Sequence, residues 1–374
     1  MRSTSPRVHF PRDGGFHAAL KRRAAEHFAV TGRARAGGRA MRAKTALILA
    51  WFAGSYALLL LWGGTSVWIA LALTASVALA TAGIGFSVMH DANHGAHSRT
   101  SRANRAWGLT LDLVGASSYI WRFKHNVRHH TYANVDGMDA DIDAEPFLRL
   151  APSQPLRAFH RHQHVYAWLL YGVLAVKWWF VDDVVDLARG RVARSPFPRP
   201  RGRELAALVA GKALFVGWTV VVPTIVFRSA WAPLLFAVGA LELGVVLSTV
   251  FQLAHTVTGA EFHAAPDGEG RMPTGWAEHQ VRATVDFARS NRLLGWYVGG
   301  LNFQVVHHLF PDICHVHYPA LARIVEATCA EHGVPYRAHP TLLAAIAAHY
   351  RHLREMGRPR PALALDLSVD RAVG

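Results

Sequence analysis

Residues 65–97 read TSVWIALALTASVALATAGIGFSVMHDANHGAH, an apolar run that ends directly in a cluster of histidines. A helix needs about 20 apolar residues to cross the roughly 30 Å of hydrocarbon in a bilayer. Residues 65–89 therefore predict a membrane-spanning helix with His90 at its end. The stretch places imidazole groups, the commonest nitrogen ligands of transition metals, at a membrane surface.

Three further apolar runs predict membrane-spanning helices, at residues 45–62, 204–227 and 230–254. The chain is 51% hydrophobic with a mean hydropathy of +0.14 although it holds 40 Lys and Arg, so polar and apolar residues must be segregated. Only Gly63-Gly64-Thr65 and Arg228-Ser229-Ala230 separate the members of each pair. The predicted fold is an all-α integral membrane protein with four transmembrane helices in two hairpins.

The basic residues predict the orientation of these hairpins. Residues 1–44 contain eleven Lys or Arg and two acidic residues, and the stretch 189–203 adds further arginines. The positive-inside rule places this side, with both chain termini, in the cytoplasm. Every histidine cluster then lies on that side, so one active site can draw on all of them.

The chain divides into three predicted regions. Residues 1–44 form a basic cytoplasmic segment with an interfacial helix, whose apolar residues recur every fourth position between 12 and 30; an ordinary packing helix explains this pattern equally well. Residues 45–335 form the membrane domain, and 336–374 a C-terminal helix and tail. The C-terminal helices are expected to cap the metal site on the cytoplasmic side.

Two features of the apolar segments require a choice. Residues 165–181 contain Lys177 and several tryptophans, which favours a helix lying in the interface rather than crossing. If this segment crossed, the third histidine cluster would be separated from the first two. Lys212 and Glu242 lie inside neighbouring predicted spans, where ionisable residues are rare and usually paired, so an ion pair between them is a possible arrangement.

The net charge of +15 does not predict a nucleic-acid partner. The basic residues flank apolar spans, and no nucleic-acid-binding motif is visible, so membrane lipids with anionic headgroups are the expected partner. Cys314 and Cys329 are both predicted on the cytoplasmic side, where disulfides are rare, and no bridge is expected. No cleavable signal peptide is expected, because the first apolar run follows more than forty polar and basic residues.

Three clusters, HDANHGAH (90–97), HNVRHH (125–130) and QVVHH (304–308), carry the predicted ligands. His90 and His94 share one helix face, and so do His125 and His129, whereas His130 is turned by about 100° and can reach a second metal. His255 lies at the end of the fourth span. Eight imidazoles give four to each of two metals. The predicted ligands are His90, His94, His125, His129, His130, His255, His307 and His308.

Other polar residues near the clusters are predicted to support the ligands. Carboxylates commonly accept a hydrogen bond from the outer N–H of a ligand imidazole. Asp91 and the aspartates after the second cluster (Asp136, Asp139, Asp141 and Asp143) fit this role, although a solvated acidic loop is an equal alternative. His315 and His317 are expected to be structural, and His97 is left out of the ligands because it lies on another face than His90. The predicted supporting residues are Gln304, Asp91, His279, Asn302 and Asp139.

Two metals, each with several imidazoles and open positions, suit oxygen activation by iron better than a tetrahedral zinc site. With these features the sequence resembles the membrane fatty acid desaturase family, in which three histidine boxes and two transmembrane hairpins hold a non-haem diiron centre. HNVRHHTYANVDGMDADID, WAEHQVRATVDFA and NFQVVHHLFPDICHVHYPAL are similar to family signature stretches. The resemblance covers residues 45 to 335.

The resemblance implies an O2-dependent desaturase that places a cis double bond in a fatty acyl-CoA or acyl-lipid substrate. Gln304, in place of the first histidine of the third box, is similar to the front-end, linoleoyl-CoA-desaturase-like group. No HPGG haem motif of a fused cytochrome b5 domain occurs. The electrons are therefore expected from a separate donor, a ferredoxin or a cytochrome with its reductase.

The histidine clusters also allow two alternatives to a desaturase. A hydroxylase or ketolase acting on a lipid or carotenoid would use the same diiron arrangement, because the boxes specify oxygen activation better than its outcome. A membrane protein for metal transport or sensing could also hold histidines. Transport, however, would require ligands near the middle of the bilayer, and all eight predicted ligands lie at or beyond the ends of the spans.

Overall fold

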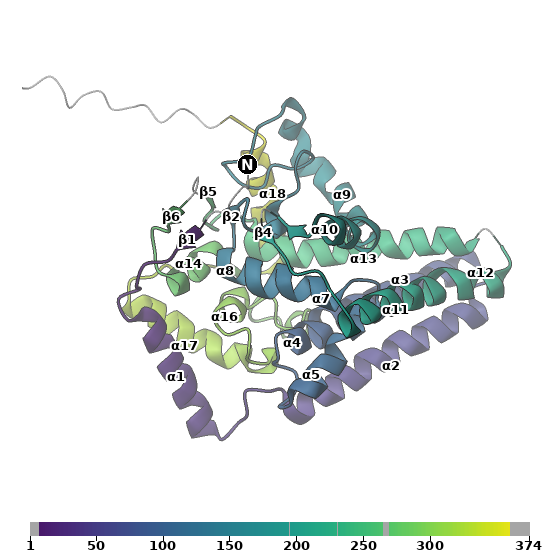
Figure 1. Cartoon of the computed structure of the whole chain (residues 1–374), viewed down its shortest axis with the longest axis horizontal. Helices are drawn as coiled ribbons and strands as arrows, with labels where there is room; N and C mark the ends of the chain where they lie inside the picture. Colours follow the sequence, from purple (N-terminus) through teal and green to yellow (C-terminus); the bar gives the residue numbers. More distant parts are fainter. Residues whose placement is uncertain (1–6, 194, 230, 265–268, 360–374) are drawn as a thin grey trace, which may run out of the picture.

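A computed structural model describes residues 7–193, 195–229, 231–264 and 269–359. The structure is mostly helical, and its short strands form two-stranded sheets (Figure 1). The predicted tail after residue 359, Ala230 at the start of the fourth predicted span, and Arg194 in the basic stretch lie outside the described residues.

The α-helices of the described residues are α1 Phe16–Thr31, α2 Gly38–Trp62, α3 Val67–Gly83, α4 His90–Asn93, α5 Ser101–Gly108, α6 Thr110–Leu113, α7 Ser118–Trp121, α8 His130–Tyr132, α9 Gln163–Lys177, α10 Asp183–Arg189, α11 Arg203–Val216, α12 Val222–Phe227, α13 Trp231–His255, α14 Trp276–Ala283, α15 Arg292–Tyr297, α16 Gln304–Leu309, α17 Tyr318–Glu331 and α18 Leu342–Met356. Wider π-helical turns are η1 Ile84–Met89, η2 Arg122–His129, η5 Trp178–Asp182 and η6 Gly217–Val221, and 3₁₀ turns are η3 Ala140–Ile142, η4 Ala158–His162 and η7 His315–His317. The paired strands are β1 Arg7–His9 with β6 Glu269–Arg271, β2 Val135–Asp136 with β5 His263–Ala264, β3 Arg191–Val192 with β4 Ser195–Pro196, and β7 Asp286–Phe287 with β8 Ala338–His339.

The two predicted hairpins are present as α2 with α3 and as α11–α12 with α13. Figure 1 shows these helices extending together in one direction, with the remaining elements gathered at their other end. α3 continues through η1 into α4, so that one helix, Val67–Asn93, carries the first histidine cluster at its end. By length and apolar composition, five helices could cross a membrane. They are Gly38–Trp62, Val67–Asn93, Ala158–Arg189, Arg203–Phe227 and Trp231–His255.

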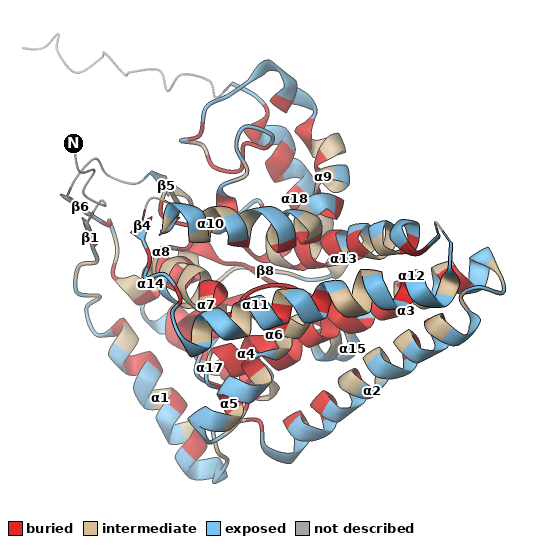
Figure 2. Ribbon diagram, turned by 45° about the vertical axis from the view of Figure 1, so that its right-hand side comes forward, coloured by how far each residue is buried: buried red, intermediate tan, exposed pale blue. Residues whose placement is uncertain are grey.

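The fifth candidate, Ala158–Arg189, runs at an angle to the other four and packs on α13 from Tyr171 to Trp179. Figure 1 looks along α10, whereas Figure 2, turned by 45°, shows α10 from the side. α9 packs on α13 where two glycines meet: a Cβ on Gly244 would lie 2.2 Å from the carbonyl oxygen of Gly172. Side chains that recur every three or four residues on this helix stay exposed. They are Val165, Leu169, Val173, Phe180 and Val184.

The remaining elements cover the ends of the span helices where His90 and His255 lie. α1, α14, α16 and α17 share one hydrophobic core, and α18 packs on α9. The predicted interfacial character of the 12–30 helix is wrong for its apolar face, because Phe16, Leu20 and Phe28 are buried in this core. The packing alternative is correct because α17 supplies a complementary apolar face, which a sequence pattern does not reveal.

The suggested ion pair between Lys212 and Glu242 is also wrong. The Lys212 ammonium lies 2.7 Å from Oδ2 of Asp183 and donates to the carbonyl oxygens of Gly115 and Trp179, each at 2.6 Å. A buried lysine is stabilised when a carboxylate and hydrogen-bond acceptors surround it. The partner comes from the helix that crosses the spans, not from the neighbouring span.

The Gly172–Gly244 crossing gives a test of this packing. We expect Gly244→Ala to destabilise the protein by about 1–3 kcal/mol, because its methyl group would meet rigid backbone. Gly217→Ala is the matched control, since a Cβ there meets nothing within 4 Å. Thermal unfolding of the detergent-solubilised protein measures both, and equal melting temperatures for the two variants would contradict the close crossing.

Candidate metal centre

Four histidines from three separate segments form the first histidine group, defined as His90, His94, His125 and His307. Each offers one ring nitrogen, and these nitrogens all lie within 4.8 Å of one another. His90 begins α4 at the end of the second span, His94 directly follows α4, and His307 comes from α16. The distance between these segments in the sequence shows that the group exists only in the folded protein.

The π-helical turn η2 determines how the second cluster is divided. In a π-helix, residues five apart lie above one another, unlike the α-helical spacing of three and four. Nε2 of His130 accordingly lies 3.2 Å from Nε2 of His125, five residues earlier. Ring nitrogens of His125 and His129 also lie together with a carboxylate oxygen of Asp141, so the expectation that these two histidines can share a metal stays a prediction. His129 lies in a further group as well.

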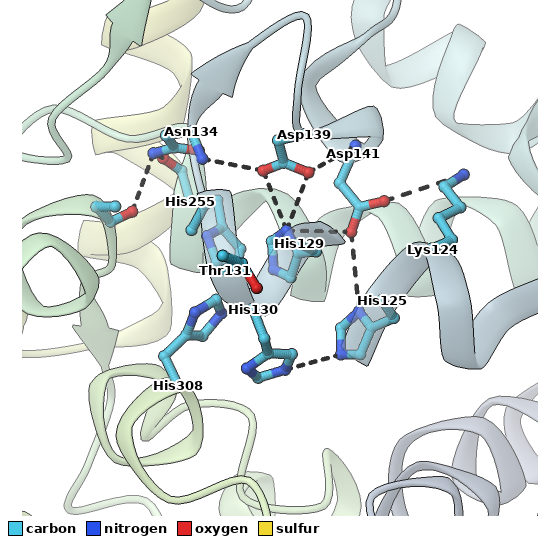
Figure 3. Close-up of polar contacts among 12 residues, drawn as sticks. Lys124, His125, His129, His130, Thr131, Asn134, Asp139, Asp141, His255 and His308 are labelled. Carbon is cyan, nitrogen blue, oxygen red and sulfur yellow. Dashed lines mark hydrogen bonds and ion pairs between the residues drawn. The ribbon is translucent and has the colours of Figure 1, made fainter. Parts of the chain in front are cut away.

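The second histidine group consists of His129, His255 and His308, again with ring nitrogens within 4.8 Å of one another. His255 is the last residue of α13, and His308 follows His307 on α16 (Figure 3). His130 lies between the groups, with ring centroids 4.5 Å from His307 and 4.4 Å from His308. All eight predicted ligands are thus brought together, seven of them in two adjoining groups and His130 between these groups.

Hydrogen bonds hold the outer nitrogens of several of these imidazoles. Nδ1 of His129 lies 3.1 Å from both carboxylate oxygens of Asp139. Nδ1 of His307 lies 3.1 Å from the hydroxyl of Tyr318, and Nδ1 of His308 lies 2.8 Å from Oε1 of Gln280. These contacts fix the ring orientations and leave the opposite nitrogens free to bind a metal.

Several nitrogens of the site are buried without partners. Buried polar groups are nearly always hydrogen-bonded, so each exception requires an explanation. A transition metal bound by neutral imidazoles supplies it, and the residues fit such a metal. Among the described residues, the buried nitrogens without a hydrogen-bond partner include both of His90, Nε2 of His94, His307 and His308, and Nδ1 of His130 and His255.

The electrostatics of the site favour neutral imidazoles, which are the form that binds metals. Burial and the neighbouring imidazoles hold five pKa values well below the ordinary value of histidine, those of His94, His125, His130, His307 and His308. Burial acts in the same direction on His129, but Asp139 and Asp141 outweigh it and raise its pKa to about 9. The carboxylates therefore distinguish His129 from the other ligands.

The predicted supporting residues have mixed outcomes. Asp139 contacts a ligand imidazole, as expected, and Nε2 of Gln304 lies 2.9 Å from Nε2 of His255. Asp91 instead binds Nδ1 of His315 at 2.8 Å, and its nearest contact with His90 Nδ1 is 3.9 Å. Asp91 follows His90 in the sequence, but its side chain points away from the His90 ring and towards His315, 224 residues later.

His279 and Asn302 do not contact the ligand imidazoles. Nε2 of His279 lies 2.9 Å from the carbonyl oxygen of Ala133, and Nδ2 of Asn302 donates to the carbonyl oxygen of Ala288 at 3.4 Å. Both are buried and hold backbone together. His97 contacts the hydroxyl of Thr45 at 2.9 Å, which agrees with a structural role.

Sequence reasoning missed three residues that support the site. Gln280 and Tyr318 hold His308 and His307, and Asn134 links two parts of the centre: its backbone N–H donates to Asp139, and its side chain donates to the carbonyl oxygen of His255. Gln280 directly follows His279, the residue of the stretch WAEHQ that was predicted to support the site. The sequence does not reveal which face of α14 is turned towards the histidine groups, so it does not distinguish Gln280 from His279.

The fold and the site together define a mostly helical protein with five candidate membrane-spanning helices and, at the ends of two of them, a cluster of histidines that could bind metal. The chain belongs to the fatty acid desaturase family, whose pattern matches residues 66–340. It is a fatty acyl desaturase, an oxidoreductase, and membership of the family generally implies the use of iron and dioxygen.

Characterised relatives agree with this assignment over nearly the whole chain. The chain is 38% identical to the sn-1 linoleoyl-lipid 6-desaturase of Arthrospira platensis, over 95% of this chain and 96% of the relative. It is 38% identical to the enzyme of the same name from Synechocystis sp., over 95% and 99%. It is also 38% identical to the acyl-lipid (8-3)-desaturase of Physcomitrium patens, over 84% of this chain and 66% of the relative.

The Tyr318 hydroxyl provides a test of the site. We expect Tyr318→Phe to lower metal affinity about 10- to 100-fold, because the outer nitrogen of His307 loses its partner. Tyr297→Phe also removes one hydroxyl, but that group donates to the carbonyl oxygen of Leu79, away from the histidines. Iron bound to each purified variant is measured by mass spectrometry. Equal iron retention would show that Tyr318 does not support the site.

Proposed function

We propose that this enzyme places a cis double bond in the acyl chain of a membrane lipid, using two iron ions held by the eight histidines. The observation that carries this proposal is the pair of adjoining histidine groups with unpartnered buried nitrogens at the ends of the span helices. An acyl-lipid substrate is favoured over an acyl-CoA because the relatives cited above are named for lipid substrates.

The residues of the chain define what the bound metals would do. With iron bound, the centre would supply dioxygen activation for removing hydrogen from unactivated C–H bonds. The first group and His130 would hold one iron, and the second group the other. Asp139, Tyr318 and Gln280 keep the ligand rings oriented, and burial of the histidines limits the access of water.

The acyl chain has no polar handle, so its position must be set by an apolar channel. A cavity lies between α2, α3, α11–α12 and α13, lined mainly by apolar and aromatic side chains that include Trp179, Phe215 and Leu243. Thr81 on its inner rim precedes His90 by nine residues, about 14 Å along a helix. We propose that the methyl end of the substrate extends from the metals towards this cavity.

We further propose a four-span topology with the helix Ala158–Arg189 in the membrane interface. The exposed apolar stripe on that helix (Val165, Leu169, Val173, Phe180 and Val184) supports this position, as does its direction across the spans. The basic residues flanking the spans favour a cytoplasmic metal centre and termini. A separate ferredoxin, or a cytochrome with its reductase, would then supply electrons from that side.

Product analysis tests the proposed activity. The chain is expressed in a host of defined fatty acid composition, and mass spectrometry locates new double bonds and identifies the lipid class that carries them. We expect a new double bond in the host that expresses the wild-type enzyme. We expect none in the host that expresses His129→Ala at an equal amount of membrane-bound protein. An added oxygen in the recovered lipid would indicate a hydroxylase or ketolase. Tightly held zinc without reductant-dependent oxygen uptake would indicate metal transport or sensing.

Cysteine labelling tests the topology. Cys314 and Cys329 are buried, so single cysteines at the exposed positions Arg161 and Arg189 should dominate labelling by an impermeant reagent. An interfacial helix predicts that both are labelled from the same side of the membrane. Thr65→Cys, in the turn of the first hairpin, is the control and should be labelled from the other side. Labelling of positions 161 and 189 from opposite sides would establish a fifth span.

A further inference from the structure

We propose that Asp141 is a positioning residue that joins the two histidine groups through the outer nitrogens of His125 and His129. The inference rests on the proposed metal centre and extends it. The Oδ2 atom of Asp141 lies 3.5 Å from Nδ1 of His129 and 3.9 Å from Nδ1 of His125 (Figure 3). One carboxylate therefore faces one ligand of each group.

The chemistry of a ligand imidazole requires such a partner. A histidine that binds a metal through Nε2 carries its proton on Nδ1, and that N–H usually donates to a carboxylate or carbonyl oxygen. Nε2 of His125 faces Nε2 of His130, so the inner nitrogen of His125 points into the centre. Asp141 is the carboxylate that faces its outer nitrogen.

Asp139 does not join the two histidine groups. Its oxygens already accept hydrogen bonds from the backbone N–H groups of Asn134 and Asp141, at 2.9 and 3.0 Å, and from Nδ1 of His129. It supports the second histidine group alone. Asp141 reaches both groups, which gives the two aspartates different roles although they are two residues apart.

Local structure explains why Asp141 faces the histidines. Asp139 caps the 3₁₀ turn η3, Ala140–Ile142, and the side chain of Ile142 is buried in a core beneath the loop. The two anchors fix the turn with Asp141 between them. Nζ of Lys124, on η2, lies 4.0 Å from the other oxygen of Asp141. Asp143 is exposed on the same loop and outside the histidine groups.

The experiment compares Asp141→Ala with Asp143→Ala in the purified, iron-loaded full-length enzyme. Iron content and the rate of iron release to a chelator are measured, with Mössbauer spectra to report on the ligand environment. Because the side chain of Asp141 is 39% exposed, its truncation should leave folding intact, which thermal unfolding of the iron-free protein checks. Asp141→Asn, which keeps an acceptor oxygen without the charge, provides a graded variant.

We expect Asp141→Ala to release iron about 10- to 100-fold faster, with altered spectra, and Asp141→Asn to lie between it and the wild type. Asp143→Ala should match the wild type. Iron release and spectra of Asp141→Ala equal to those of the wild type would overturn the inference, as would equal acceleration by Asp143→Ala. A wild-type protein that takes up no iron would instead overturn the proposed metal centre.

Discussion

The structure depends on burying a set of imidazole rings whose inner nitrogens have no hydrogen-bond partner. Each buried polar atom left unpaired costs about 1–3 kcal/mol, a large amount beside the net stability of a protein. Helix ends, loops and the covering helices hold the rings in place, although no hydrogen bond among the described residues offsets this cost at the unpartnered nitrogens. Metal ligation would offset it, and we infer that a bound metal would contribute to the stability of the fold as well as to its chemistry.

This constraint explains the division of the chain between membrane and cap. The spans bring His90 and His255 to one end of the bundle, where α16 adds His307 and His308 and the turn η2 adds the remaining ligands. The covering helices then supply side chains that reach the outer nitrogens, such as Gln280 from α14 and Tyr318 from α17. Gln280 and Tyr318 thus reach the site from helices that pack over it, whereas Asp139 reaches it from the loop that follows the second histidine cluster.

The sequence predicted the parts of this arrangement that depend on local patterns. Apolar length located the two hairpins, and the histidine spacing identified residues that the fold brings together, His255 included. Contacts between distant segments could not be predicted this way. Asp91 binds His315 because α4 and η7 meet, and the π-helical turn η2 brings His130 against His125, five residues earlier. Neither effect leaves a periodic signal in the sequence.

The position of the centre at the ends of the spans also follows from the substrate. An acyl chain offers no charge or hydrogen bond by which one methylene can be distinguished from the next. The distance from a fixed point must therefore select the bond, and a rigid helix such as Val67–Asn93 can fix it, because it joins the cavity wall at Thr81 to the ligand His90. Changing the helix between these residues would shift the selected bond, whereas changing the ligands would remove the reaction.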